Sequence, residues 1–307
     1  MADVFWTLAE RVHTLTAQGQ PLAVLTVVST QEIHSRWPGT RFCMDLKGQV
    51  WGGMLHPLTH QALMPQVQQV LRTGKARVFH WAPDPAHGST SVDEPCTFFI
   101  ESMEQLPESW RMAVEHLKHR EGCIVATELD DHPRHYLLSE EDAPVRPDRR
   151  GTLLSGVFLQ RLEPALRMVV SGSQDTASSL LSLARAIHLE VTSVGSTLPE
   201  LDAWTALVVF PEPEHEVLQV LLKALQGEVG YIGVVCSLWH ARHLKERLLQ
   251  AGAPRMERVF APAGLHLGTV SSQGMALEIL AEILAVFHQQ EPHSLDLKSA
   301  DWMGPFR

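Results

Sequence analysis

Serines and a single glycine at a strand-to-helix junction form the first candidate binding site of this chain. The apolar run Leu166–Val170 predicts a strand, and the turn that follows reads SGSQDT at positions 171–176. A dinucleotide-binding turn needs glycines where this one has serines, because the chain must bend tightly and approach a pyrophosphate. Asp175, which we expect to cap the next helix, would also repel a phosphate. This turn therefore predicts at most a modified nucleotide pocket and disfavours NAD(P), and its candidate residues are Gly172, Ser173 and Gln174.

A second candidate site lies in the first third of the chain. Pro38-Gly39 predicts a tight turn between two strands, and Gly52-Gly53 precedes a helix that Pro57 opens. Glycines at such a junction let backbone N–H groups point at an anion, which nearby arginines could neutralise. Paired glycines before a helix also form plain turns, so both interpretations stay open. The candidate residues are Arg36, Gly39, Gly52 and Gly53, with Arg41 as a further cation.

The third candidate site is a pair of loops that follow two late strands. Cys236 and Ser237 precede a predicted helix, whose dipole lowers the pKa of a nearby thiol. The alternative is a buried inert thiol, the commoner state of free cysteine. The run APAGLHLG at 261–268 follows the last strand, at the edge where α/β sheets bind ligands. This edge adds Cys236, Ser237 and Gly264 to the candidates.

Histidine pairs at helical spacing do not predict a metal site. Of the 17 histidines, His240 with His243 and His116 with His119 are typical pairs. A metal site needs three or four converging ligands, and neither a cysteine nor an acid completes either pair in sequence. We expect these histidines on solvated helix faces and no bound metal.

The elements that must position these residues fall into two groups. Residues 1–163 predict an α+β domain of two related halves, about 1–103 and 104–163, each with a helix followed by strands. One mismatch is a helix at 58–73 that the second half lacks. Residues 164–290 alternate strands with helices, which predicts a Rossmann-like parallel sheet, and 291–307 form a tail. The predicted fold class is therefore α/β.

Composition excludes several classes of function. The 307 residues carry 25 Lys plus Arg against 35 Asp plus Glu, a formal net charge of −10, which disfavours nucleic acid and anionic membranes as partners. The longest apolar stretches are too short to span a bilayer. Residues 1–15 predict an amphipathic helix and not a secretory signal. The four cysteines form no CxxC pair, so we expect a cytoplasmic protein.

Three C-terminal segments and several N-terminal ones carry a family resemblance. The C-terminal segments are GYIGVVCS (230–237), FAPAGLHLG (260–268) and ALEILAEI (276–283). The N-terminal ones are AVLTVV (23–28), PG (38–39), WGGML (51–55), FFIE (98–101) and VFLQ (157–160). Together these segments resemble the XdhC/CoxI family of maturation factors for xanthine and carbon monoxide dehydrogenases. The resemblance covers nearly the whole chain and is most specific in the loop at 260–268.

The departures from the family pattern cluster at polar positions that would face a ligand. The family's GAGHVA turn is SGSQDT here, Met54 replaces its cysteine, and His56 replaces the following glutamate. Residues 236–240 replace its GSRRK, and His266 stands where an acid is usual, which adds His266 to the candidate residues. The apolar framework survives, so a divergent member with altered ligand chemistry and a paralogue kept for partner binding are both consistent with this pattern.

The resemblance implies an accessory factor that binds molybdenum cofactor, the apo form of a molybdenum hydroxylase, or both, for cofactor insertion. It favours a cofactor-binding chaperone over an enzyme, and Met54 disfavours sulfur transfer at the family's cysteine. We expect a homodimer, with a sulfurtransferase or a related family member as a further partner. The alternatives are an NAD(P)-dependent oxidoreductase and a non-catalytic partner subunit, in which Trp302 and Phe306 would be interface anchors.

Overall fold

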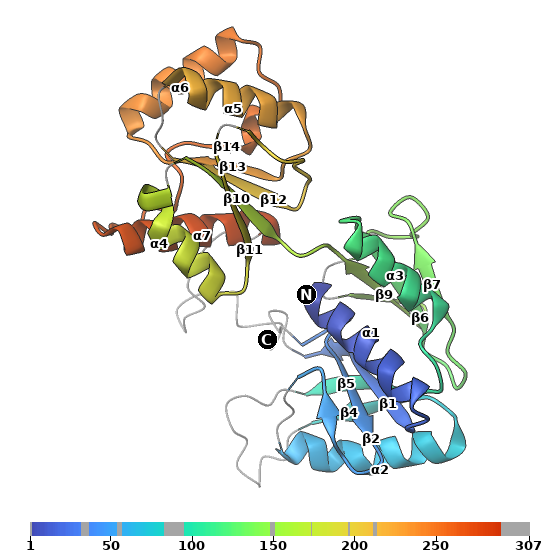
Figure 1. Cartoon of the computed structure of the whole chain (residues 1–307). Helices are drawn as coiled ribbons and strands as arrows, with labels where there is room; N and C mark the ends of the chain where they lie inside the picture. Colours follow the sequence, from blue (N-terminus) through green and yellow to red (C-terminus); the bar gives the residue numbers. More distant parts are fainter. Residues whose placement is uncertain are drawn as a thin grey trace, which may run out of the picture. The chain divides into compact units, whose positions relative to one another are not determined.

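The computed structural model describes residues 2–31, 37–53, 57–82, 95–147, 151–172, 174–195, 197–210 and 214–289. These residues form two compact units, one ending at Pro164 and one beginning at Ala165 (Figure 1). Among them, every helix is too short or too polar to cross a bilayer. Arg36, Met54, His56, Ser173, Trp302 and Phe306 lie outside the described residues.

The first half of unit 1 is a five-stranded antiparallel sheet in the order β3-β2-β1-β5-β4. Its elements are α1 (Ala2–Ala17), β1 (Leu22–Thr30), β2 (Arg41–Asp45), β3 (Val50–Trp51), α2 (Pro57–Thr73), β4 (Arg77–Trp81) and β5 (Cys96–Met103). The central strand β1 is apolar along most of its length because helices cover both faces. Leu22 and Val24 share a core with α1, and Ala23, Leu25 and Val27 share one with α2.

The second half of unit 1 is a four-stranded antiparallel sheet in the order β7-β6-β9-β8. Its elements are α3 (Glu108–Lys118), β6 (Cys123–Glu128), β7 (His135–Leu138), β8 (Thr152–Leu154) and β9 (Val157–Leu162). The buried residues of α3 repeat the spacing of those of α1: Phe5, Leu8, Ala9 and Val12 correspond to Trp110, Ala113, Val114 and Leu117. The two helices share one core, which joins the halves into a single unit.

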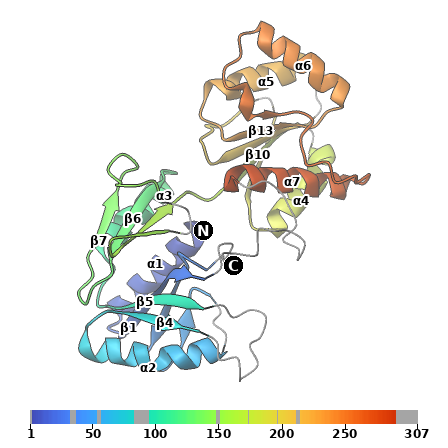
Figure 2. The same cartoon turned by 180° about the vertical axis from the view of Figure 1, so that it is seen from behind.

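Unit 2 is a five-stranded parallel sheet in the order β11-β10-β12-β13-β14. Its elements are β10 (Arg167–Ser171), α4 (Gln174–Ala186), β11 (Glu190–Val194), β12 (Thr205–Val209), α5 (Glu214–Gln226), β13 (Tyr231–Val234), α6 (Leu238–Gln250), β14 (Val259–Phe260) and α7 (Ser272–His288). Helices α4 and α7 pack on one face of the sheet, and α5 and α6 pack on the other (Figure 2). The predicted fold class, an α+β domain followed by a Rossmann-like sheet, is confirmed.

One predicted helix start is shifted, and the predicted helix of the first half is present. Helix α4 begins at Gln174, so Asp175 lies in its first turn and does not precede the helix as a cap. The helix expected in the first half and missing from the second is present as α2, Pro57–Thr73. In the described part of 104–163, β6 passes to β7 and β8 without such a helix.

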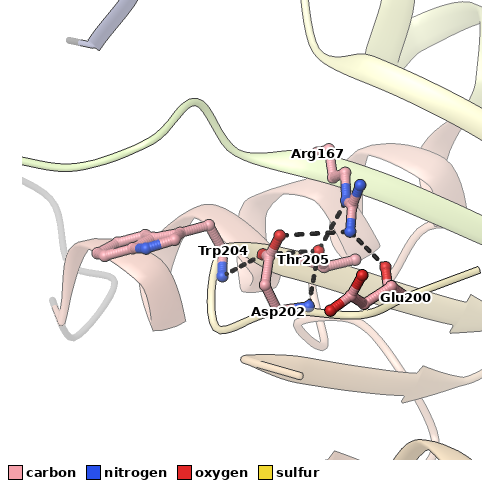
Figure 3. Close-up of polar contacts among 5 residues, drawn as sticks. All are labelled: Arg167, Glu200, Asp202, Trp204 and Thr205. Carbon is pink, nitrogen blue, oxygen red and sulfur yellow. Dashed lines mark hydrogen bonds and ion pairs between the residues drawn. The ribbon is translucent and has the colours of Figure 1, made fainter. Parts of the chain in front are cut away.

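A polar cluster fixes the start of the sheet in unit 2 (Figure 3). Arg167 Nε donates to Thr205 Oγ1 at 2.9 Å, and Arg167 Nη2 lies 3.3 Å from Asp202 Oδ2. The Thr205 hydroxyl donates to Asp202 Oδ1 at 2.9 Å, and the backbone N–H of Trp204 donates to the same oxygen at 2.8 Å. Arg167 Nη2 also donates to the carbonyl of Glu200 at 2.5 Å. The first strand of unit 2 is thereby tied to the loop that precedes β12.

Thr205→Val is expected to lower the free energy of unfolding of unit 2 by about 1–3 kcal/mol. Thr205 is fully buried and valine has a similar shape, so the change removes the three hydrogen bonds of the hydroxyl without creating a cavity. Chemical denaturation followed by far-UV circular dichroism measures the loss. Thr192→Val serves as a control, because that residue lies on the edge strand β11. Equal stability of Thr205→Val and the wild type would contradict the structural role of this cluster.

Candidate functional site

The turn after β10 is hydrogen-bonded to the end of the neighbouring strand β11. The backbone N–H of Gly172 donates to the carbonyl of Val194 at 3.3 Å, and Ser171 Oγ donates to the carbonyl of Gly195 at 3.0 Å. Gly172 has a φ of 119°, and a Cβ there would lie 2.9 Å from the Cβ of Phe210. Glycine is therefore required at this position by packing and backbone conformation. The Gly172 amide is used inside the unit, where the prediction had it facing an anion.

Cys236 and Ser237 connect β13 to α6 at the same edge of the sheet. Ser237 is the N-cap residue of α6, and its Oγ accepts from the backbone N–H of His240 at 3.3 Å. Cys236 is half-buried, and burial raises the pKa of its thiol. The expected lowering by the helix dipole is not what the surroundings of Cys236 produce, so the inert thiol is the better interpretation.

Two glutamates of α7 hold the loop that follows β14. Glu282 Oε2 accepts from the Gly264 N–H at 2.9 Å and from the Tyr231 hydroxyl at 2.6 Å. Glu278 Oε1 accepts from the backbone N–H groups of Leu267 and Thr269, both at 3.1 Å. These two carboxylates were not among the predicted site residues. Glutamates four residues apart on one helix were the available signal, since they share a helix face.

This clamp bears directly on the predicted phosphate cradle. The Gly264 amide, predicted to donate to an anion, is occupied by Glu282. Two carboxylates beside the loop would also oppose a phosphate electrostatically. His266 is exposed on this loop, close enough for its charge to affect Glu278. At this edge of unit 2, the Gly172 and Gly264 amides are therefore already used inside the unit.

The clamp at Glu278 is expected to weaken in acid. The hydrogen bond from the Thr269 N–H, with those from the Thr269 hydroxyl and the Leu267 N–H, lowers the pKa of Glu278 below its ordinary value of 4.5. Because the folded pKa is depressed, the stabilisation is complete above the unfolded value and is lost as pH falls through the folded one. Hydrogen exchange at the Leu267 and Thr269 amides, corrected for intrinsic rates, should stay protected near pH 6 and lose protection below about pH 4. Protection that is unchanged at the lower pH would contradict the clamp.

In unit 1, two of the predicted glycine turns meet at the start of β2. The Gly39 N–H donates to the carbonyl of Val27 at 2.8 Å, which closes the turn between β1 and β2. Gly52 has a φ of 95°, and a Cβ there would lie 2.9 Å from the carbonyl oxygen of Arg41. Gly52 and Gly53 are both exposed. Gly39, Arg41 and Gly52 are thus brought together, while Arg36 lies outside the described residues.

A buried polar network lies behind these turns. A guanidinium nitrogen of Arg41 donates to Gln160 Oε1, and Gln160 Nε2 donates to the carbonyl of Gly39 at 3.0 Å. His135 Nε2 lies 2.8 Å from Glu101 Oε2, and both side chains are almost fully buried. The Arg41 guanidinium also packs against the rings of Phe5 and Trp110, 5.3 and 5.2 Å from their centroids. Polar groups from both halves therefore meet in the interior of unit 1.

The strand registers show that this network has pseudo-two-fold symmetry. In the first half, Val24 of β1 pairs with Glu101, and in the second half Val125 of β6 pairs with Gln160. By the same alignment Thr26 pairs with Arg41, and Thr127 pairs with His135. Arg41 corresponds to His135, and Glu101 to Gln160. The contacts cross between the halves, because Arg41 bonds Gln160 and His135 bonds Glu101.

The network places a full positive charge in the protein interior. Burial lowers the pKa of Arg41 to about 10, and the negative charge of Glu101 opposes that shift. Arg41 consequently remains protonated at neutral pH, and Glu101 supplies a buried charge of opposite sign. A buried ion that has a partner is tolerated, whereas a buried ion without one is strongly destabilising. Arg41 was predicted to neutralise a ligand, but in the structure its side chain faces the protein interior.

The described residues contain no group of three or more His, Cys, Asp or Glu side chains that could hold a metal ion. Cys43 and Cys123 are buried, and burial raises the pKa of each thiol to about 12. These two cysteines belong to the apolar core of unit 1.

Fold and site define a class of protein: an antiparallel α+β unit with duplicated halves, followed by a Rossmann-like unit whose glycine turns are modified. The family described as the XdhC Rossmann domain matches residues 168–283, and the XdhC and CoxI family matches residues 15–82. The chain belongs to the XdhC/CoxI family.

A solved structure has the same fold. It is a protein from Bacillus halodurans described as a xanthine dehydrogenase, with a TM-score of 0.66 over 93% of this chain and 97% of that one. Sequence identity is 14%, so this similarity concerns the fold alone. No protein with a curated description matches the chain.

Proposed function

We propose that this protein is an accessory factor for maturation of a molybdenum hydroxylase of the xanthine dehydrogenase type, binding the molybdenum cofactor, the apo-enzyme, or both. The observation that carries the proposal is the family match in both units, at 15–82 and 168–283. Members of this family are named for xanthine and carbon monoxide dehydrogenases. Membership therefore supports a role in the maturation of such an enzyme. The protein binds and delivers, and it does not turn over a substrate.

The contacts favour unit 1 over the sheet edge of unit 2 for any cofactor cargo. At that edge the Gly172 and Gly264 amides are used internally, and Glu278 and Glu282 would repel the cofactor's phosphate. In unit 1, Gly52 and Gly53 are exposed, and the network of Arg41 and Gln160 fixes the neighbouring turn at Gly39. Exposed glycine amides beside a rigid turn suit an anionic group.

Co-expression in a host that makes molybdopterin tests the proposal. The purified protein is denatured and oxidised, and the released pterin is measured by fluorescence; the same preparation is examined for a co-purified hydroxylase. Either a stoichiometric pterin or a bound apo-hydroxylase supports the proposed role. Neither pterin nor hydroxylase in the preparation would contradict it.

NAD(P)-dependent oxidoreduction is the competing function, and the parallel sheet of unit 2 is what favours it, because dinucleotides bind at the carboxyl ends of the strands in such sheets. The Gly172 amide bonds Val194 and the Gly264 amide bonds Glu282, which opposes it. We expect no binding of NADH or NADPH at millimolar concentration, measured by calorimetric titration. Saturable binding of either cofactor would reverse this choice.

A further inference from the structure

The solvent-exposed face of helix α6 carries large apolar side chains. Its buried residues are Ala241, Leu244 and Leu248, and the other face is exposed. Two large apolar side chains at its first turn stay in solvent: Leu238 is 61% exposed and Trp239 is 63% exposed. Exposed apolar residues of this size, grouped on one helix turn, are typical of interaction sites.

The charge of helix α6 is opposite in sign to the net charge of the whole chain. Its exposed face carries three cations, Arg242, Lys245 and Arg247, and one acid, Glu246. The chain as a whole has a formal net charge of −10. A cationic helix face with an aromatic anchor on an acidic protein is complementary to an acidic protein surface.

The loop clamped by α7 lies at the same edge of the sheet as the start of α6. Strands β13 and β14 are neighbours, and α6 and the loop leave the sheet at their carboxyl ends. The Ala263 N–H donates to the carbonyl of Val234, which ties the loop to the strand before α6. Leu267 and Val270 on the loop are 58% and 104% exposed.

The clamp gives these exposed residues a fixed backbone. Glu278 holds the Leu267 and Thr269 amides, and Glu282 holds that of Gly264. Ordering a loop on binding costs free energy, so a loop that is already ordered binds more tightly. The clamp therefore has a use beyond stability, since it presents Leu267 and Val270 in one conformation.

We propose that Leu238, Trp239, Arg242, Lys245, Leu267 and Val270 form a docking face for an acidic surface of the hydroxylase apo-enzyme. This inference rests on the proposed function, because it names where the partner binds. Trp239 is the anchor: its ring packs against His243, with centroids 4.0 Å apart, and His240 meets it edge-on. Histidine contacts on the same helix hold the indole in place while most of it stays accessible.

Two variants test this docking face against the purified hydroxylase apo-enzyme encoded in the same genome, by biolayer interferometry at low and high salt. Trp239→Ala is expected to weaken binding at least about tenfold, mainly through faster dissociation. Arg242→Glu/Lys245→Glu is expected to slow association and to flatten its salt dependence. All three residues are exposed, so thermal unfolding of both variants should match the wild type.

Matched controls come from another exposed region of unit 2. Ile187→Ser removes an apolar side chain that is 45% exposed, and Arg185→Glu reverses an exposed charge. Both controls should bind as the wild type does.

Three outcomes would overturn the docking face. If the wild type binds and both test variants bind equally well, the face is wrong while the proposed function stands. If the wild type does not bind the apo-enzyme at all, partner docking and this face fall together. If the test variants instead disperse a dimer of the wild type in light scattering, the occupant is a second copy of this chain.

Discussion

Replacing Glu101 by glutamine is expected to lower the free energy of unfolding of unit 1 by about 3–5 kcal/mol. The shape of the side chain is kept, and only its charge is removed. Glu101 is 2% exposed, and its negative charge acts on the buried Arg41. Without that carboxylate, Arg41 becomes a buried cation with no compensating charge from Glu101. Urea denaturation followed by tryptophan fluorescence measures the loss, because the buried Trp110 packs against Arg41.

Two further variants make that result specific. Glu104→Gln changes an exposed carboxylate three residues away and should leave stability within about 0.5 kcal/mol of the wild type. Arg41→Met/Glu101→Gln removes both charges and should be less destabilised than the sum of its single changes, since neither buried charge is then left without the opposite charge that acts on it. Glu101→Gln with wild-type stability would show that the network is not charge-compensated as described.

Replacing Glu282 by alanine is expected to cost unit 2 about 3 kcal/mol and to release the loop after β14. The Tyr231 hydroxyl loses its acceptor inside the core, where Tyr231 is fully buried and stacked on Phe260 with centroids 4.7 Å apart. The Gly264 amide loses its acceptor as well. Denaturation measures the stability, and hydrogen exchange at Gly264 measures the loop.

Tyr231→Phe separates the two consequences of that change. It removes the hydroxyl while Glu282 keeps its bond to Gly264, so stability should fall by about 1–2 kcal/mol with the loop still protected. Equal loss of Gly264 protection in Tyr231→Phe and Glu282→Ala would contradict a direct role of Glu282 in holding the loop.

The fold could be read from the sequence because its signals are local. The alternation of strands and helices after Pro164 predicts a parallel sheet, and the spacing of Trp110, Ala113, Val114 and Leu117 predicts an amphipathic α3. Boundaries shifted by one or two residues, as for α4, whose first turn contains the expected cap Asp175.

The candidate site was less predictable because its contacts are long-range. Arg41 and Gln160 are 119 residues apart, and Glu101 and His135 are 34 apart. The sequence shows that FFIE and VFLQ are similar segments that close the two halves. It does not show that their last residues, Glu101 and Gln160, each bond a side chain of the other half. The glycine turns predicted where free backbone amides could lie. Whether such an amide is already hydrogen-bonded depends on an acceptor elsewhere in the chain, such as Glu282 for Gly264.

The crossed contacts of unit 1 have an evolutionary consequence. Arg41 meets Gln160, the counterpart of Glu101, and His135 meets Glu101 itself. Such reciprocal contacts are those of an isologous interface, in which residue i of one subunit meets residue j of the other and the reverse. An ancestor with one copy would satisfy these groups only as a homodimer. In a fused chain, each of these positions occurs once in each half and can change independently of its counterpart. The first half could therefore hold Arg41 and Glu101 while the second half holds His135 and Gln160 at the corresponding positions.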